Sequence, residues 1–535
     1  MEREAGAFAV AVAGVYSTGM IASSAAARPP GNGSADAPGV VAMVRLTGEV
    51  TTKSRRTRLR FQRRLARNIA AALRRDSAGE PDDFEIREEW SRFYVRVPEA
   101  DRLEPLARVF GVSSYSVLDG SCPADLEAIV SLGTRLYGEA VQGRRFAVRV
   151  RRRGSQPFRS RDIAVQLGAA LNPGATVDLD DPDVEVRVEV RDDRAFLFSS
   201  RVEGAGGLPL GAEGRAVALL SGGFDSAVAA WMMLRRGVSL EYVFCNLAGE
   251  AYRRMVLEVA HVLADRWSAG APARIHVVDF RGVVDDLRRA VPGSLLQVML
   301  KRRMYAAAAA IGRTGKAQAL VTGESVGQVS SQTLANLRVI DDASDVPVLR
   351  PLVGMDKEEI VARSRRIGTY ELSARVREHC AISDGRTATA ARPTAVRAAA
   401  AALGPAVLAR AVKQAERIDL HALELSDVAA DALFVDTIPP GAVGVDMRPA
   451  AARVAAPWPG AVPRSFAALS AGFGDLDDRR THVLVCERGL LSAQVAERMQ
   501  AEGREAYSLR GGDRQLRALL AAAGGAGGPG EEEGA

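Results

Sequence analysis

Apolar and polar positions repeat with a different period in successive parts of the chain, and each period predicts its own kind of element. From about 82 to 200, short runs alternate apolar and polar residues, as in Val184 to Val190, which predicts half-buried strands. From 215 to about 400, continuous apolar runs alternate with segments of helical period. That order predicts alternating strands and helices, and therefore a doubly wound parallel sheet.

The N-terminal half is expected to be α+β. It begins with a strand at 41–45 and a helix at about 57–75. Every fourth position on one face of that helix is apolar, which is typical of a helix packed on a core: Phe61, Leu65, Ile69 and Leu73. Further strands are predicted at 84–86, 93–97, 146–151, 184–190 and 195–198.

The central region supplies the predicted parallel sheet. Its strands are expected at 216–220, 239–246, 274–280 and 317–322. Helices are expected at 227–236, 253–266, 283–290 and 295–312. Ligands of such sheets bind at the carboxyl ends of the strands. Two polar loops follow strands here, Ser221 to Ser226 and Thr322 to Glu324, so both are candidate ligand contacts.

The C-terminal part changes pattern again. Residues 400–430 are rich in alanine and are expected to be helical. Beyond 436–441, short strands at 443–446 and 483–485 and a helix ending at Gly503 predict a second, smaller α/β domain.

The loop Ser221-Gly-Gly-Phe-Asp-Ser226 is the strongest chemical signal. It joins a buried strand to a helix, so glycine backbone and helix N-terminal amides face one point, and such amides bind phosphate. The Gly-Lys-Ser/Thr ending of a Walker loop is absent. The spacing resembles the loop of the ATP pyrophosphatases, which cleave ATP to AMP and pyrophosphate while adenylating a substrate.

Charge is concentrated locally. The net charge is only +6, which favours a polyanionic partner weakly. A first basic cluster precedes and enters the helix at 57–75 without one acidic residue: Lys53, Arg55, Arg56, Arg58, Arg60, Arg63, Arg64 and Arg67. A second follows a strand: Arg149, Arg151, Arg152 and Arg153. Both suit contacts to nucleic-acid phosphates, although a solvated face remains the plainer interpretation of a charge run.

The four cysteines, Cys122, Cys245, Cys380 and Cys486, are far apart and include no Cys-x-x-Cys pair. This spacing does not favour structural zinc or a disulfide framework, and no residue is assigned to a metal. Cys122 and Cys245 are interpreted as buried thiols, the latter in a strand.

Cys486 opens a strand-to-helix loop, where amides and the helix dipole stabilise a thiolate. Arg488 adds positive charge within this loop. Such a cysteine can carry sulfur as a persulfide. The loop, with Tyr507 to Gly512 after it and Asp446-Met-Arg448 before it, resembles a rhodanese (sulfurtransferase) domain.

The chain ends carry no predicted domain. No stretch of about 18 apolar residues exists that could span a membrane. The first residues lack the positive charge of a signal peptide. A disordered leader at 1–40, a disordered Gly-rich tail at 515–535 and a cytoplasmic protein are therefore expected.

A basic N-terminal half, an ATP pyrophosphatase loop and a rhodanese-like end, in this order, resemble the ThiI family of tRNA 4-thiouridine synthases. The resemblance covers about 41–512. Its most specific block runs from Leu320 to Arg338 and continues at Leu349 to Leu352. The joint Gly206 to Gly211 and the sequence Cys486-Glu-Arg-Gly also agree.

The resemblance implies a domain order. A ferredoxin-like domain would occupy 41–115, a THUMP RNA-binding domain 116–201 and an ATP pyrophosphatase (PP-loop) domain 202–400. A helical linker would follow at 401–433 and a rhodanese domain at 434–514.

The resemblance also implies roles for particular residues. Asp225 would be catalytic, with Mg²⁺ beside ATP. The ATP contacts would be Leu219, Leu220, Ser221, Gly222, Gly223, Asp225, Ser226, Lys301, Gly323 and Gln332. Cys486 would carry the persulfide, and Cys380 would form a disulfide with it. Family members often have Tyr-Cys-Gly where this chain has His379-Cys380-Ala381, which leaves the thiol in place.

The implied reaction is ATP-dependent replacement of the C4 oxygen of uridine 8 in tRNA by sulfur. The implied partners are tRNA, a cysteine desulfurase as sulfur donor, a thiol reductant, and the sulfur-carrier protein that supplies the thiazole of thiamine. The oligomeric state is left open, with a homodimer as one option.

Two alternatives remain open. One is another PP-loop adenylating tRNA-modifying ligase, which would lack the 320–338 block and the Cys486 loop. The other is a non-enzymatic tRNA-binding protein, against which the intact loop and Lys301 argue.

Overall fold

The computed structural model describes residues 39–76, 83–89, 91–247, 249–374, 376, 387–423, 433–486 and 490–524. The chain divides into two compact units, which are described one at a time. One contains 116–200, and the other contains 40–115 together with 201–535. Most of the predicted leader lies outside the described residues, and the first strand begins at Val40.

The N-terminal sheet has the strand order β10-β4-β1-β3-β2. Its strands are β1 (Val40–Leu46), β2 (Glu85–Glu89), β3 (Arg92–Val97), β4 (Val112–Val117) and β10 (Val202–Glu203). Helix α1 (Gly48–Thr51), helix α2 (Arg55–Asp76) and the 3-10 helix η1 (Ala100–Arg108) accompany it. The predicted apolar face of α2 is fully buried, which confirms that helix: Phe61, Leu65, Ile69 and Leu73.

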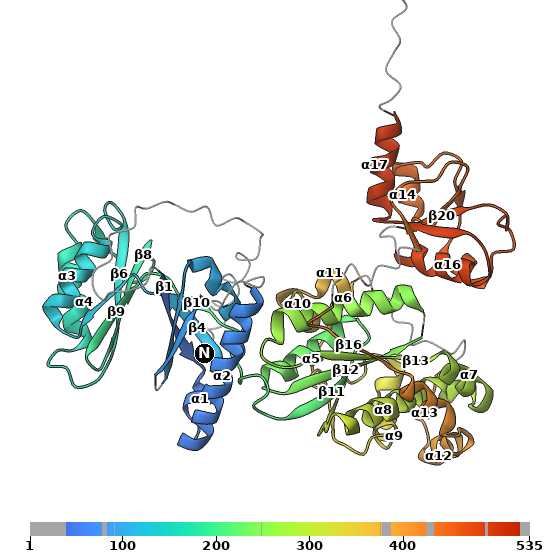
Figure 1. The fold of residues 1–535 in the computed structure, drawn as a ribbon, viewed down its shortest axis with the longest axis horizontal. Coiled ribbons are helices and arrows are strands. Elements are labelled where there is room, and N and C mark those ends of the chain that lie inside the picture. Colours follow the sequence, from blue (N-terminus) through green and yellow to red (C-terminus); the bar gives the residue numbers. More distant parts are fainter. Residues whose placement is uncertain are drawn as a thin grey trace, which may run out of the picture. The chain divides into compact units, whose positions relative to one another are not determined.

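The unit 116–200 is a second α+β sheet, with the order β5-β9-β8-β6-β7. Its strands are β5 (Gly120–Pro123), β6 (Arg145–Arg153), β7 (Thr176–Val177), β8 (Val184–Arg191) and β9 (Arg194–Phe198). Helices α3 (Leu126–Tyr137) and α4 (Ser160–Leu171) lie beside this sheet (Figure 1). β6 and β8 run parallel, with Phe146 opposite Val184, so their alternating apolar residues share one buried face.

The central sheet has the order β15-β14-β11-β12-β13-β16. Its strands are β11 (Arg215–Leu219), β12 (Ser239–Asn246), β13 (Arg274–Asp279), β14 (Leu320–Val321), β15 (Val348–Leu349) and β16 (Glu416–Asp419). All are parallel except β16, which confirms the predicted doubly wound sheet. The strand order reverses between β11 and β14, and ligands bind at such a switch point.

Helices cover both faces of the central sheet. α5 (Phe224–Arg235) and α6 (Glu250–Trp267) pack on one face, and α7 (Arg281–Ala290) and α8 (Leu296–Thr314) on the other. The remaining elements are α9 (Leu334–Asp341), α10 (Lys357–Ile367), α11 (Tyr370–Ser373), α12 (Pro393–Ala402), α13 (Ala406–Lys413) and the 3-10 turns η2 (Gly293–Leu295) and η3 (Ser330–Gln332).

The prediction of a purely helical linker at 401–433 is wrong for 416–419. These residues form β16, which pairs antiparallel with β13 at the sheet edge, with Ile418 opposite Ile275. An edge strand is held mainly by backbone hydrogen bonds to the neighbouring strand. The side chains of four residues beside an alanine-rich helix therefore do not predict that strand.

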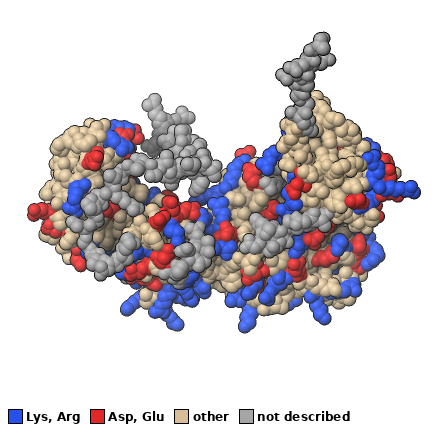
Figure 2. Space-filling model, turned by 45° about the horizontal axis from the view of Figure 1, so that its top comes forward, with Lys and Arg blue, Asp and Glu red and all other residues tan. Residues whose placement is uncertain are grey.

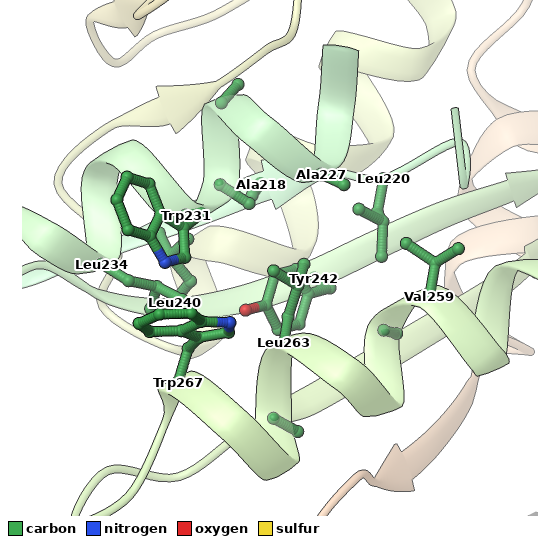
Figure 3. Packing of buried hydrophobic residues seen from close by; sticks show 14 of the residues in the cluster. Ala218, Leu220, Ala227, Trp231, Leu234, Leu240, Tyr242, Val259, Leu263 and Trp267 are labelled. Carbon is green, nitrogen blue, oxygen red and sulfur yellow. The ribbon is translucent and has the colours of Figure 1, made fainter. Parts of the chain in front are cut away.

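An aromatic cluster joins the N-terminal sheet to the central domain. Figure 3 shows Trp231 of α5 and Trp267 of α6 beside Leu240 and Tyr242 of β12. Phe110, which follows η1, stacks on Trp267 with ring centroids 5.6 Å apart and meets Trp231 edge-on at 5.8 Å. These parts of the chain therefore share one core.

The C-terminal sheet is parallel, with the order β17-β21-β20-β18-β19. Its strands are β17 (Phe434–Val435), β18 (Val443–Asp446), β19 (Val462–Pro463), β20 (His482–Val485) and β21 (Ala506–Leu509). Its helices are α14 (Ala450–Ala455), α15 (Phe466–Ala471), α16 (Leu490–Ala501) and α17 (Asp513–Gly524).

The prediction of a disordered tail from 515 is wrong as far as 524. Helix α17 occupies these residues because Leu516 is buried against Val483, Val485 and Leu509. The Gly-rich composition that suggested a tail belongs to the residues after 524, which lie outside the described part.

Among the described residues, no single helix is both long and apolar enough to cross a membrane. Taken together, α12 and α13, bent by 71° at their junction, meet that test by length and composition.

Candidate functional site

The loop Ser221–Ser226 is held in one shape by its own residues. Gly222 has φ +78°, in the left-handed region that favours glycine, and a Cβ there would lie 3.0 Å from the Val256 side chain. The Ser226 hydroxyl accepts a hydrogen bond from the Ser221 amide at 3.1 Å and donates to the Gly223 carbonyl at 3.1 Å. Gly223 is the N-cap of α5, so the loop directs the first amides of that helix toward one point.

Gly323 allows the end of β14 to approach α5. A Cβ at this position would lie 2.5 Å from the Asp225 carbonyl carbon, which no side chain tolerates. A glycine is therefore required here by close packing of backbone on backbone.

A cavity of about 290 Å³ lies at the carboxyl ends of β11, β12 and β14. Eight of the ten residues predicted to bind ATP line it: Leu219, Leu220, Ser221, Asp225, Ser226, Lys301, Gly323 and Gln332. The other two, Gly222 and Gly223, shape the loop beside it. Tertiary structure thus brings together residues that are up to 113 positions apart in the chain.

Several cavity residues were not predicted as site residues. Phe244 and Cys245 line the cavity from the end of β12, although Cys245 was interpreted only as a buried strand thiol. Tyr305 lines it as well. Glu324, which also lines it, belongs to the loop Thr322 to Glu324 that was expected at a strand end, although no role was predicted for its side chain. Their position in the sequence could have identified Phe244 and Cys245, because they lie at the carboxyl end of the strand next to β11, where ligands bind.

Both carboxylate oxygens of Asp225 are hydrogen-bonded. The Lys357 ammonium, from the first turn of α10, donates to Oδ1 at 2.7 Å, and the Gln328 amide donates to Oδ2 at 2.8 Å. The Lys357 side chain is about half exposed at 48 %, whereas Asp225 is buried. The loop therefore carries a carboxylate whose charge is largely offset.

Glu324 is a buried anion beside the cavity. Its Oε2 accepts hydrogen bonds from the Tyr305 hydroxyl, from Arg350 Nε at 2.9 Å and from the Thr322 hydroxyl at 3.1 Å. Lys301 Nζ lies 3.6 Å from the other oxygen, Oε1. Burial alone raises the pKa of Glu324, but the Lys301 charge, the Tyr305 hydrogen bond and Arg350 outweigh it and hold the pKa below its usual range.

The first predicted basic cluster forms a solvent-facing surface. Most of its side chains are exposed, on the residues just before α2 and on its outer face: Lys53, Arg55, Arg56, Arg60, Arg63 and Arg67. Arg58 and Arg64 are half-buried. Figure 2 shows Lys and Arg side chains gathered in one area of this part of the chain.

The second basic cluster, on β6, is partly used internally. Arg149 pairs with Glu185 at 3.1 Å, and Arg152 donates to the Gln156 side chain at 2.8 Å and the Gly154 carbonyl at 3.0 Å. Arg151 and Arg153 are exposed. The predicted four-arginine surface is therefore reduced to Arg151 and Arg153, because Arg149 is paired with Glu185 of the neighbouring strand and Arg152 is bonded to the loop that follows β6.

Cys486 lies between β20 and α16 and is buried, with 4 % of its surface exposed. The Ser492 hydroxyl donates to its Sγ at 3.3 Å, and the Ser508 hydroxyl lies 2.8 Å from that of Ser492. Asp513 donates its amide to the Cys486 carbonyl at 3.1 Å. The predicted loop residue Arg488 and the predicted partner Cys380 lie outside the described residues, so their roles stay predictions.

Asp446 and Arg448 form a buried ion pair beside this cysteine. Arg448 binds both oxygens of Asp446 and also donates to Asp513 at 2.6 Å. Arg448 therefore connects β18 to Asp513 at the start of α17, and the Asp513 amide in turn binds the Cys486 carbonyl. The hydrogen bonds to these carboxylates raise the pKa of Arg448, so the side chain remains a cation despite its burial.

Three family models match the chain. The model described as a ThiI ferredoxin-like domain matches 41–116, the THUMP domain matches 123–200, and the model described as thiamine biosynthesis protein (ThiI) matches 211–403. The predicted ferredoxin-like and THUMP folds are thereby confirmed. No matched model covers the C-terminal sheet, so its rhodanese assignment stays a prediction.

Curated relatives match along most of the chain. A tRNA sulfurtransferase of Pyrobaculum aerophilum is 38% identical over 86% of this chain and 95% of its own length. A tRNA sulfurtransferase of Marinobacter nauticus is 37% identical over 86% of this chain and 97% of its own length. Among solved structures, a 4-thiouridine synthetase–RNA complex with bound ATP is 30% identical, with a TM-score of 0.62, and covers 71% of this chain and 99% of that one.

Proposed function

The chain belongs to the ThiI family of tRNA sulfurtransferases, and from this premise we propose that it uses ATP to replace the C4 oxygen of uridine 8 in tRNA by sulfur. The observation that carries the proposal is the convergence of the Ser221–Ser226 loop, Lys301 and Gly323 on one cavity at the switch point of the sheet. Helix N-terminal amides and a lysine point charge suit a triphosphate.

The first step activates the uridine. An oxygen at a carbonyl carbon is a poor leaving group, and AMP is a good one. The uridine O4 attacks the α-phosphorus of ATP, the bond to the bridging oxygen breaks, and pyrophosphate leaves. The loop amides and Lys301 hold the phosphates in line for this displacement.

Mg²⁺ is expected to accompany ATP. This ion commonly binds through one or two carboxylates and through phosphate oxygens. Asp225 supplies one carboxylate at the cavity, and the described residues contain no group of three or more metal-binding side chains. The residues therefore fit an ion held mainly by the nucleotide, which would neutralise phosphate charge.

The second step delivers sulfur from Cys486. A cysteine desulfurase transfers a sulfane sulfur to the thiolate, giving a persulfide. Its terminal sulfur attacks C4 and expels AMP, which leaves the base joined to Cys486 through a disulfide bond. The hydrogen bond from Ser492 to Sγ suits a sulfur that carries negative charge.

Cys380 completes the cycle. Its thiolate attacks the Cys486 sulfur, releases 4-thiouridine and leaves a Cys380–Cys486 disulfide that an external dithiol reduces. Val376 and Thr387 flank the segment that carries Cys380. A Cβ on Gly222 of the loop would lie 3.2 Å from Val376, and Thr387 lines the cavity. Both flanking residues therefore lie at the nucleotide site, which supports the proposed role of Cys380.

tRNA binding is assigned to the basic surface before and on α2, with a contribution from Arg151 and Arg153 in the unit 116–200. Arginines on one helix face bind phosphates without reading sequence. The same persulfide can pass sulfur to the sulfur-carrier protein of thiazole synthesis, which gives the chain its second proposed role.

Mass spectrometry of digested tRNA tests the proposal. A strain that lacks the gene should lose 4-thiouridine and regain it with the wild-type chain but not with Cys486→Ser. The Cys486→Ser protein should still release pyrophosphate from ATP when tRNA is present, whereas Asp225→Ala should not. Full 4-thiouridine in the deletion strain would overturn the proposal.

A further inference from the structure

Two of the described residues that line the cavity carry carboxylates, Asp225 and Glu324. They differ in what their oxygens contact. Both oxygens of Asp225 accept hydrogen bonds, from Lys357 and from Gln328. Glu324 accepts all its hydrogen bonds at Oε2, and its Oε1 has no hydrogen-bond partner.

This oxygen, which has an ion pair with Lys301 but no hydrogen bond among the described residues, is deeply buried. Glu324 has 2 % of its surface exposed, and the nearest cation, Lys301 Nζ, lies 3.6 Å from Oε1, beyond hydrogen-bond distance. A buried charged oxygen without a hydrogen bond is costly unless a ligand supplies the donor. Because the residue lines the cavity, that donor is expected to come from a bound substrate.

The groups around Glu324 fix its carboxylate in place. Lys301 and Tyr305 face it from α8, Thr322 from the end of β14, and Arg350 from the residue after β15. Arg350 is itself held by Asp341 of α9, at 3.1 Å. With Oε2 held by three donors, the orientation of the carboxylate is fixed, and Oε1, on a residue that lines the cavity, is a preorganised acceptor.

The proposed reaction requires such an acceptor. When uridine O4 forms a bond to phosphorus, the pyrimidine ring gains positive charge unless the N3 proton leaves. Loss of this proton gives a neutral ring with a double bond between N3 and C4. The proton becomes far more acidic as the new bond forms, so even a weakly basic carboxylate can accept it.

We propose that Glu324 is the general base that removes the N3 proton of the target uracil during adenylation. This inference rests on the proposed function. The O4 electron pair forms the bond to the α-phosphorus, the electrons of the broken bond leave with pyrophosphate, and the N3 proton passes to Oε1. After sulfur displaces AMP, the proton returns to the thiolated base. Glu324 is then ionised for the next cycle.

Alternatively, Glu324 could accept a hydrogen bond from ATP, for example from a ribose hydroxyl, and take no part in proton transfer. Glu324→Gln separates the two, because an amide oxygen still accepts a hydrogen bond but takes up no proton. A residue that only binds ribose would change ATP affinity. A general base would change the rate of adenylation at saturating ATP.

The experiment measures single-turnover pyrophosphate release from ATP and tRNA without a sulfur donor, together with the ATP dissociation constant. Glu324→Gln should slow release by at least about 100-fold at saturating ATP, with ATP affinity changed less than about fivefold. Its rate should rise toward alkaline pH, as uridine loses the N3 proton to solvent, while the wild-type rate stays level.

A modified substrate gives a second readout. Fluorine at C5 makes the N3 proton more acidic, so tRNA with 5-fluorouridine at position 8 should restore a large part of the Glu324→Gln rate and change the wild-type rate little. Asp345→Asn is the control variant. It removes one carboxylate charge from a residue that pairs with Arg313 and does not line the cavity, and its rate should stay within about threefold of wild type.

Three outcomes would overturn the inference: a Glu324→Gln rate close to wild type, an equal loss on uridine and 5-fluorouridine, or a loss explained by weaker ATP binding. Each leaves the proposed function standing if the wild-type protein releases pyrophosphate with tRNA. Failure of the wild-type protein to do so would instead contradict the proposed function, and this inference with it.

Discussion

The ammonium group of Lys357 lies 2.7 Å from the Asp225 carboxylate, which ties the start of α10 to the first turn of α5. Asp225 stands in a loop suited to phosphate, where an uncompensated negative charge would repel the ligand. Lys357 removes much of that repulsion from outside the cavity, because it does not belong to the cavity lining.

Lys357→Ala should therefore weaken ATP binding by about threefold to tenfold, since a half-exposed ion pair is worth roughly 1 kcal/mol. Equilibrium titration with ATP measures this effect. In the Asp225→Asn background the same substitution should change affinity little, because there is no carboxylate left to offset. Lys413→Ala removes an exposed lysine elsewhere and is the control. Equal losses in both backgrounds would contradict the shielding role.

Loss of the hydrogen bond from Ser492 to Cys486 should lower the reactivity of the Cys486 thiol. A thiolate that loses a hydrogen bond is destabilised by about 1 kcal/mol. Ser492→Ala should thus slow alkylation of Cys486 by iodoacetamide at neutral pH by about fivefold, measured by peptide mass spectrometry.

Ser508→Ala is the matched variant, because it removes the hydroxyl that lies 2.8 Å from that of Ser492. Its effect should be smaller than that of Ser492→Ala. Unchanged alkylation in Ser492→Ala would show that this hydrogen bond does not influence the thiolate.

The basic surface on α2 predicts salt-dependent tRNA binding. Replacing Arg60, Arg63 and Arg64 by Gln should weaken affinity by about tenfold or more near physiological salt and lower the slope of log affinity against log salt. Replacing Arg313 of α8 together with Arg410 and Lys413 of α13, which removes the same charge elsewhere, should have a smaller effect in filter-binding titrations. Equal effects of the two sets of substitutions would show that tRNA affinity depends on the net charge of the protein and not on the α2 surface.

Because Phe110 packs on the central domain, the N-terminal sheet and the central domain are expected to stabilise each other. The ring is 2 % exposed and contacts both Trp231 and Trp267. Phe110→Ala should lower the free energy of unfolding by about 3–5 kcal/mol and alter tryptophan fluorescence. Phe158→Ala, in the core of the unit 116–200, should leave that fluorescence unchanged. A wild-type melting profile for Phe110→Ala would contradict the shared core.

His482 predicts acid sensitivity of the C-terminal sheet. It is fully buried, and neither ring nitrogen has a hydrogen-bond partner within the part of the chain that the structure describes. Burial, followed by the nearby Arg504 charge, lowers the pKa of His482. The folded state therefore binds this proton less readily than the unfolded state, so stability is complete above the ordinary histidine pKa of about 6.5 and falls as pH drops through the folded value.

The hydrogen-exchange protection of β20 and β21, corrected for the intrinsic exchange rate at each pH, should accordingly fall as the pH drops below the ordinary histidine pKa, and fall less in His482→Leu. Peptides from 116–200, which contain no histidine, provide an internal reference. Identical pH dependence in the variant would assign the acid sensitivity to other groups.

Sequence patterns predicted the elements well where a local period was clear. The apolar stripe of α2 and the strands β11, β12 and β13 follow from side-chain alternation or continuous burial, which the chain carries locally. The patterns failed at β16 and α17, which depend on a neighbouring strand and on a buried Leu516.

The loop Ser221–Ser226 and the candidate cysteine Cys486 can be found from sequence, because glycine spacing, capping and strand-to-helix order are local properties. Which distant groups complete the site follows only from the packing of the elements. The fold brings Lys357 onto Asp225 across 132 positions and, among the described residues, leaves one oxygen of Glu324, a cavity-lining residue, without a hydrogen-bond donor. Burial and hydrogen-bond satisfaction depend on all the elements packed around a group, and no local pattern records them.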